Sequence, residues 1–136
     1  MDRSSALLVA VSLVALACGR PSPAAVASVS QIVVEMNEFR FRPATIVLRA
    51  GRPAVIRFVN RGQIAHQIQA DSLRHLPVTI VDAHSRVEAP GLDILRLQPG
   101  ATATLSFLPR ASGRMPFACT IEGHQEAGMT GVFAVR

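Results

Sequence analysis

The sequence has 136 residues, which is enough for one domain and too short for a large multidomain enzyme. The formal net charge is +5, all 14 basic side chains are arginines, and the chain has neither Tyr nor Trp. This composition argues against nucleic-acid binding, because the arginines are scattered and no Tyr or Trp offers a stacking surface for bases. The modest positive charge favours attraction to an acidic partner instead.

The first 18 residues, MDRSSALLVAVSLVALAC, have the layout of a secretory signal, in which one arginine precedes an apolar run over residues 6–17. The run is shorter than the about 20 residues that a membrane-spanning helix needs. Small residues directly before a cysteine resemble a bacterial lipoprotein signal, so we expect Cys18 to carry an acyl anchor. Ordinary cleavage near Ala17, or further along the chain, is the alternative. Both interpretations predict an exported protein, in the bacterial periplasm or tethered at the cell envelope.

Residues 19–30, GRPSPAAVASVS, are small and nearly uncharged, and they predict a flexible linker. From residue 31 onward, short runs of alternating hydrophobicity are separated by turn residues, which is typical of β-strands. QIVVEM is the first such run, and ATIVLRAGRPAVIRFVN contains two more, joined at an Ala-Gly pair. IAHQIQA is expected to place Ile64, His66 and Ile68 on one apolar face of a strand and Gln67 and Gln69 on the other face.

The segment 71–92 is the least regular part of the chain, and we expect one strand at residues 78–81 within a longer connection. Its histidines, His75 and His84, are interpreted as solvated loop residues. ATATLSFL shows the clearest alternation, and MPFAC and GVFAVR are the last expected strands. Seven or eight short strands within residues 31–136 predict an all-β, two-sheet sandwich around one core.

The loop before the last strand, CTIEGHQEAGM, carries Cys119, His124 and Met129 at intervals of five residues. Ten fully extended steps would span roughly 33–36 Å, whereas the ligands of one metal ion lie about 2–3 Å from it. The loop must therefore curl, and a glycine directly before the histidine and the methionine permits the necessary backbone conformations. With His66 from a separate strand, the set becomes two imidazoles, one thiolate and one thioether, which are the ligands of blue-copper electron-transfer sites.

These residues resemble a known family. VNRGQIAHQ, followed at a distance by MPFACTIEGHQEAGMTGVFAV, is similar to the cupredoxins, and the Cys-x4-His-x4-Met spacing resembles auracyanin and sulfocyanin, with an azurin-like first gap. The resemblance covers residues 31–136 and implies a Greek-key β-sandwich with one type 1 copper ion bound by His66, Cys119, His124 and Met129. It also implies that His124 is the ligand nearest the surface and offers an exposed edge to a docked partner. Gln67 stands where relatives often have asparagine and Glu122 where they often have proline, which leaves the bracing of the ligand loop open.

The predicted function is a monomeric single-electron carrier of the cell envelope that cycles between Cu(I) and Cu(II) with a redox protein such as a cytochrome or an oxidase. An envelope protein that delivers or stores copper is the alternative, although such proteins tend to display Met-rich or His-rich stretches, which this sequence lacks. An enzyme such as a multicopper oxidase or a nitrite reductase is not expected, because the sequence contains no His-x-His pair and has room for one domain only. A binuclear copper site would need a second cysteine on the loop.

Overall fold

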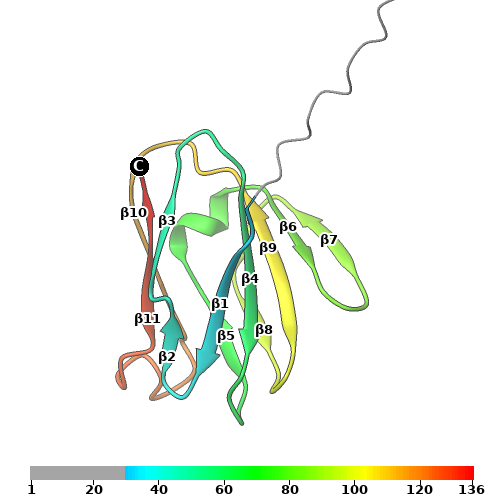
Figure 1. The fold of residues 1–136 in the computed structure, drawn as a ribbon, viewed down its shortest axis with the longest axis vertical. Helices are drawn as coiled ribbons and strands as arrows, with labels where there is room; N and C mark the ends of the chain where they lie inside the picture. Colours follow the sequence, from blue (N-terminus) through cyan, green and yellow to red (C-terminus); the bar gives the residue numbers. More distant parts are fainter. Residues whose placement is uncertain (1–29) are drawn as a thin grey trace, which may run out of the picture.

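The computed structural model describes residues 30–136, so the predicted signal, Cys18 and all but the last residue of the predicted linker lie outside the described residues. Eleven short strands and one 3₁₀ helix form this part of the chain (Figure 1). In chain order they are β1 (Ile32–Asn37), β2 (Arg40–Arg42), β3 (Thr45–Leu48), β4 (Ala54–Asn60), β5 (His66–Ile68), η1 (Asp71–His75), β6 (Val78–Val81), β7 (Arg86–Ala89), β8 (Leu95–Leu97), β9 (Thr102–Phe107), β10 (Gly113–Ala118) and β11 (Thr130–Val135). Within residues 30–136, no helix is long and apolar enough to cross a membrane.

The strands form two packed layers (Figure 1). One layer is a six-stranded sheet in the order β2-β1-β4-β9-β6-β7. The other is the sheet β10-β11-β3, which a bridge between Gln69 and Ala118 extends to the pair β5-β8. Strands β1 and β4 pair in parallel, as do β3 and β11, and the chain passes from one layer to the other between β3 and β4. The predicted all-β sandwich of the Greek-key type is confirmed.

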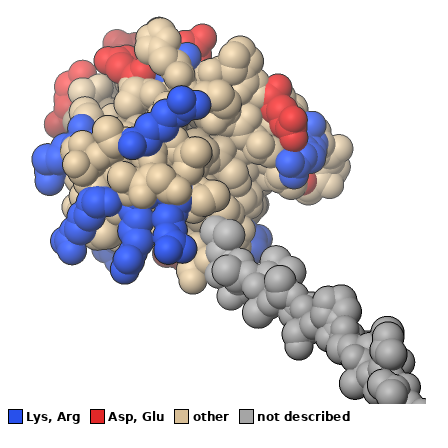
Figure 2. Space-filling model, turned by 90° about the horizontal axis from the view of Figure 1, so that it is seen from above, with Lys and Arg blue, Asp and Glu red and all other residues tan. Residues whose placement is uncertain are grey.

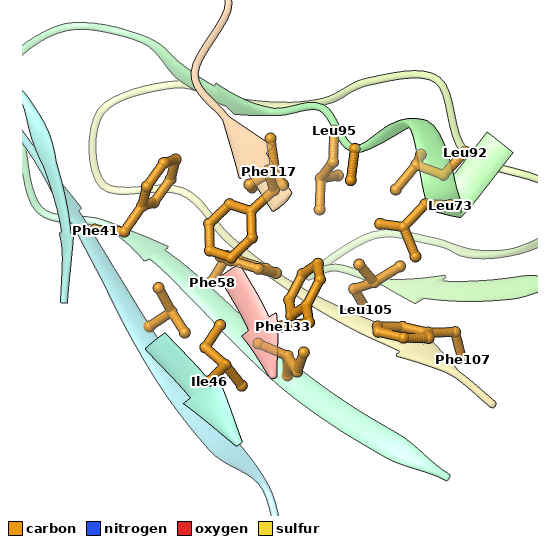
Figure 3. Packing of buried hydrophobic residues seen from close by; sticks show 14 of the residues in the cluster. Phe41, Ile46, Phe58, Leu73, Leu92, Leu95, Leu105, Phe107, Phe117 and Phe133 are labelled. Carbon is orange, nitrogen blue, oxygen red and sulfur yellow. The ribbon is translucent and has the colours of Figure 1, made fainter. Parts of the chain in front are cut away.

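The alternating sequence pattern decides which side chains form the core between the layers. Along β9, Ala103, Leu105 and Phe107 are buried, while the hydroxyl side chains between them are partly exposed. The ring of Phe117 from β10 stacks on that of Phe133 from β11, with centroids 4.5 Å apart (Figure 3). Burial of a phenylalanine side chain contributes about 1.5–3 kcal/mol to the stability of a fold. The scaffold that carries the candidate ligands is therefore held by an apolar core of its own.

Residues 30–136 contain eleven strands where the sequence pattern indicated seven or eight, because the pattern did not indicate β2, β7 and β8. The strands β2 and β8 are only three residues long, and β7 exposes three of its four residues. The strand expected at residues 78–81 is confirmed as β6. The segment 71–92 also contains the 3₁₀ helix η1 and the strand β7, which the sequence pattern did not indicate.

The expectation for Ile64 is wrong. Its side chain is 43 % exposed, and β5 begins only at His66. The carbonyl of Ile64 accepts a hydrogen bond of 2.8 Å from Nδ2 of the buried Asn60, which also donates to the carbonyl of Leu97. These bonds hold Ile64 in the bend before the strand, so the strand begins two residues later than the pattern suggests.

The two ends of the sandwich differ in character. His66, Cys119 and Met129 lie at one end, where β5 begins, β10 ends and β11 has yet to start. At the opposite end β3 and β11 finish side by side, which brings Arg49 and Arg136 together next to the turn into β4. Figure 2 shows the molecule from above, and several arginine side chains (blue) lie close together on the surface that faces the viewer.

Candidate metal centre

The loop between β10 and β11 brings three of the four predicted ligands together. The backbone N–H of Cys119 donates to the carbonyl of Met129, and the N–H of Met129 donates to the carbonyl of His124, each over 3.0 Å. Gly123 and Gly128 have φ angles of +82° and +97°, in the left-handed region that favours glycine. The glycines before the histidine and the methionine therefore have the role that the sequence indicated, because they let the loop fold back on itself.

His66 reaches the same place from β5, whose pairing with β10 is set by the Gln69–Ala118 bridge. Ligand atoms of His66, Cys119 and His124 all lie within 4.8 Å of one another. The Sγ atom of Cys119 is 3.3 Å from Nδ1 of His124, and the two imidazole centroids are 5.2 Å apart. Bonds of about 2.3 Å to sulfur and about 2.0 Å to nitrogen would place two ligand atoms of one ion about 3.5 Å apart. The three side chains are therefore spaced as ligands of a single metal ion.

Burial and the lack of alternative partners support a metal at this position. His66, Cys119 and Met129 are fully buried, and His124 is 6 % exposed. Neither ring nitrogen of His66 has a hydrogen-bond partner among the described residues, which is costly for a buried polar group. Burial, and secondly the neighbouring His124, lower the pKa of His66 below its ordinary value, which favours the neutral imidazole that binds metals. Two imidazoles with a thiolate and a thioether suit copper.

Met129 is positioned through its backbone. Its N–H and carbonyl are bonded to His124 and Cys119, and its side chain is fully buried. The loop thus carries the thioether into the interior of the protein, on a residue bonded through its backbone to Cys119 and His124. Its role as the axial ligand stays a prediction from the sequence.

Gln67 braces the two ligand-bearing segments against each other. Its backbone N–H points to Sγ of Cys119 at 3.4 Å, and its side-chain Nε2 donates to Oγ1 of Thr120 over 2.7 Å. The hydroxyl of Thr120 donates in turn to Oε1 of Gln69 over 2.7 Å. The glutamine therefore makes a bridge to the ligand loop, although relatives often have asparagine at this position. An N–H group directed at the sulfur would also stabilise a thiolate.

Comparison with known proteins agrees with this geometry. A family model described as a cupredoxin-like domain matches residues 7–135 of the chain. The chain belongs to the cupredoxin family. It is 34 % identical over 122 residues to the copper-resistant cuproprotein CopI of Rubrivivax gelatinosus, a match that covers 87 % of this cupredoxin and 73 % of CopI.

Solved structures share the fold at low sequence identity. Auracyanin from Roseiflexus castenholzii superposes with a TM-score of 0.56 and 20 % identity, over 78 % of this cupredoxin and 96 % of auracyanin. A multicopper oxidase from Campylobacter jejuni gives a TM-score of 0.62 and 13 % identity over 77 % of this cupredoxin. The match covers only 29 % of the oxidase, so this cupredoxin spans less than a third of that enzyme's length. At these identities the likeness concerns the fold alone.

Sequence reasoning missed the turn between β1 and β2, which carries a neighbour for each histidine of the cluster. Oε1 of Glu38 lies 3.6 Å from Nε2 of His66, and the ring of Phe39 stands edge-on to that of His124, with centroids 4.9 Å apart. Hydrogen bonds from the backbone N–H groups of Glu38 and then Gln63 lower the pKa of the Glu38 carboxyl, so it is an anion at neutral pH. No spacing in the sequence connects residues 38 and 39 with the ligands. Their proximity follows from the parallel pairing of β1 with β4, which leads directly to the His66 loop.

Two further expectations concern histidines outside the cluster. His75 and His84 are both exposed, and neither belongs to the metal-type cluster found among residues 30–136. The interpretation of both as solvated residues is confirmed, although His75 ends the 3₁₀ helix η1 and does not lie in a loop.

Proposed function

We propose that this cupredoxin is a single-electron carrier that holds one type 1 copper ion with His66, Cys119, His124 and Met129. The buried His-Cys-His cluster, with ligand atoms within 4.8 Å of one another, is the observation on which the proposal rests. Bound copper would supply a one-electron Cu(I)/Cu(II) couple. The hydrogen bonds that close the loop and the bridge from Gln67 to Thr120 hold the ligand-bearing segments in place, so little reorganisation would accompany a change of charge.

His124 is the proposed point of electron exit and entry. It is the most exposed of the four candidate ligands, but at 6 % its edge is far narrower than the family resemblance implied. Phe39 covers part of this ring and is itself 40 % exposed, and Ile64 on the same loop as His66 is 43 % exposed. These apolar side chains support docking of a redox protein at this end of the sandwich. Three candidate ligands are fully buried and the fourth is almost so, which leaves no evident position for a substrate and supports a carrier over an enzyme.

Copper delivery or storage is the second candidate, and the relationship to a copper-resistant cuproprotein favours it. The two functions differ in one measurable property. A carrier retains its copper and exchanges electrons rapidly with a small redox reagent, whereas a delivery protein loses its copper to a competing Cu(I) chelator on the same timescale. Stopped-flow measurements of both reactions on the copper-loaded chain discriminate between the two functions.

The copper site itself is tested by visible and electron-paramagnetic-resonance spectra after addition of one equivalent of Cu(II). We expect an intense visible band from thiolate-to-copper charge transfer, which Cys119→Ser abolishes because the thiolate is removed. Cys18→Ala, which removes the other cysteine of the chain, is the matched control and should keep the band. A coloured Cys119→Ser protein would show that the thiolate has been assigned to the wrong residue.

We also propose that the protein is exported and that an acyl chain on Cys18 anchors it at the cell envelope. The proposal is supported by the apolar run and small residues that precede this cysteine. Cys18→Ala should move the protein from the membrane fraction to the soluble envelope fraction, as measured by fractionation and immunoblotting. An unchanged distribution between the two fractions would refute the anchor.

A further inference from the structure

The carboxylate of Glu38 ties the turn between β1 and β2 to the loop that carries His66. Its Oε1 accepts hydrogen bonds from the backbone N–H groups of Gln63, over 2.6 Å, and Ile64, over 3.3 Å. The same oxygen lies 3.6 Å from Nε2 of His66. One carboxylate oxygen therefore faces both the end of the loop and the imidazole that begins β5.

Gly62 makes this close approach possible. A Cβ atom at this position would overlap Oε1 of Glu38 and would lie 2.9 Å from Nε2 of His66. The backbone of Gly62 is itself fixed, because its N–H donates to Oδ1 of the buried Asn60 over 2.9 Å. The carboxylate, the imidazole and the glycine backbone thus pack as a unit with no room for another side chain.

The orientation of the His66 ring assigns a role to each of its nitrogens. Nε2 is turned toward Glu38, which leaves Nδ1 for a metal ion shared with Cys119 and His124. Histidines that bind metals commonly donate their other ring N–H to a carboxylate or a carbonyl, which fixes the ring and makes it a stronger donor. Glu38 is the group in position to accept that proton, since neither nitrogen of His66 has another partner among the described residues.

We propose that Glu38 is a positioning residue of the copper site, which orients the His66 imidazole and its loop and places a negative charge that favours Cu(II) over Cu(I). The inference rests on the copper site proposed above. It adds Glu38 to the four candidate ligands as a residue that influences the reduction potential. A negative charge behind a ligand stabilises the more highly charged ion more strongly, by Coulomb attraction in a partly buried environment. Removal of the charge should therefore raise the potential.

Two substitutions separate charge from positioning. Glu38→Gln keeps an oxygen that can accept from Gln63 and Ile64 but removes the charge, whereas Glu38→Ala removes both. Loss of a group that supports a metal ligand typically costs 10–100-fold in metal affinity. For Glu38→Gln we expect about a tenfold loss of affinity for Cu(II) relative to Cu(I), which equals a rise in potential of about 59 mV for a one-electron couple. Protein-film voltammetry measures the potential directly.

Glu35→Gln is the matched control. Glu35 lies on β1, which leads into the turn that carries Glu38, and it forms an ion pair of 3.4 Å with Arg61, the first residue of the loop that leads to His66. Its substitution therefore removes one charge nearby without touching His66. We expect its potential to stay close to that of the wild type. A Glu38→Gln potential no different from that of Glu35→Gln would overturn the inference.

The effect of Glu38 on the position of the His66 loop is measured in the metal-free protein. Hydrogen exchange of the amides of Gln63 and Ile64 in the metal-free protein should accelerate in Glu38→Ala and stay near the wild-type rate in Glu38→Gln. Equal exchange in all three proteins would contradict the proposed hold on the loop.

If the wild type gives no thiolate–copper band, the proposed copper site fails and this inference fails with it. If the band is present while the potential of Glu38→Gln is that of the wild type, only the inference about Glu38 fails.

Discussion

At the level of single residues, the four candidate ligands are held in unequal ways. The backbone N–H of Gln67 points to Sγ of Cys119. The His66 imidazole faces the Glu38 carboxylate, and the His124 ring lies against that of Phe39. Among residues 30–136, the thioether of Met129 makes no hydrogen bond, and its place is fixed by burial and by the backbone of its own loop. Met129 is therefore the ligand that substitution can change with the least disturbance of the others.

Met129→Leu should keep the visible colour and raise the reduction potential, because a weak axial donor to Cu(II) is lost. Tenfold weaker relative binding of Cu(II) equals about 59 mV, and we expect a shift of that order by voltammetry. Exchange of Met for Leu in a core usually costs less than about 1.5 kcal/mol of stability. Met36→Leu, at a fully buried methionine of β1, is the control and should leave the potential unchanged. Equal potentials in wild type and Met129→Leu would argue against axial ligation.

The sequence reveals the candidate site unevenly, and the reason lies in how its residues are connected. Cys119, His124 and Met129 share one loop, so regular spacing and two glycines make them visible as a motif. Glu38 and Phe39 meet the histidines only because β1 pairs in parallel with β4, and a pairing between distant segments leaves no local signal. Supporting residues of this kind need the folded structure to be found.

At the level of elements, alternation of apolar and polar residues predicts a strand only where one face of the strand is buried and the other is exposed to solvent. The strand β9 fits this condition, and the alternation of ATATLSFL predicts it. The strand β7 has three exposed residues and one half-buried residue, so it shows no apolar face to detect. In β5 all three residues are buried, because Gln67 turns inward to bridge to the ligand loop, and the expected alternation of apolar and polar sides fails there. The elements that the pattern misses are those whose burial is decided by distant contacts.

At the scale of the whole molecule, a metal ion would link segments that are far apart in the chain. His66 belongs to β5 beside β8, whereas Cys119, His124 and Met129 belong to the connection between β10 and β11. In the described part of the chain, the bridge between Gln69 and Ala118 alone joins these two groups of strands by backbone hydrogen bonds. An ion bound by all four residues would strengthen the weakest junction of that layer.

Removal of copper should therefore lower the stability of the fold without unfolding it, since most of the apolar core consists of side chains that are not candidate ligands. A ligand that binds only the folded state at a hundredfold excess over its Kd adds about 2.7 kcal/mol. For a domain of about 100 residues, 1 kcal/mol corresponds to a shift in Tm of about 4–8 °C, so copper should raise the Tm by about 10–20 °C. Calorimetry of the metal-free and copper-loaded chains measures this difference. Cys119→Ser is the control, because it exchanges a single atom in the core and removes the thiolate ligand, and copper should raise its Tm much less than that of the wild type. Equal rises in both proteins would mean that copper acts elsewhere on the chain and does not join β5 to the ligand loop.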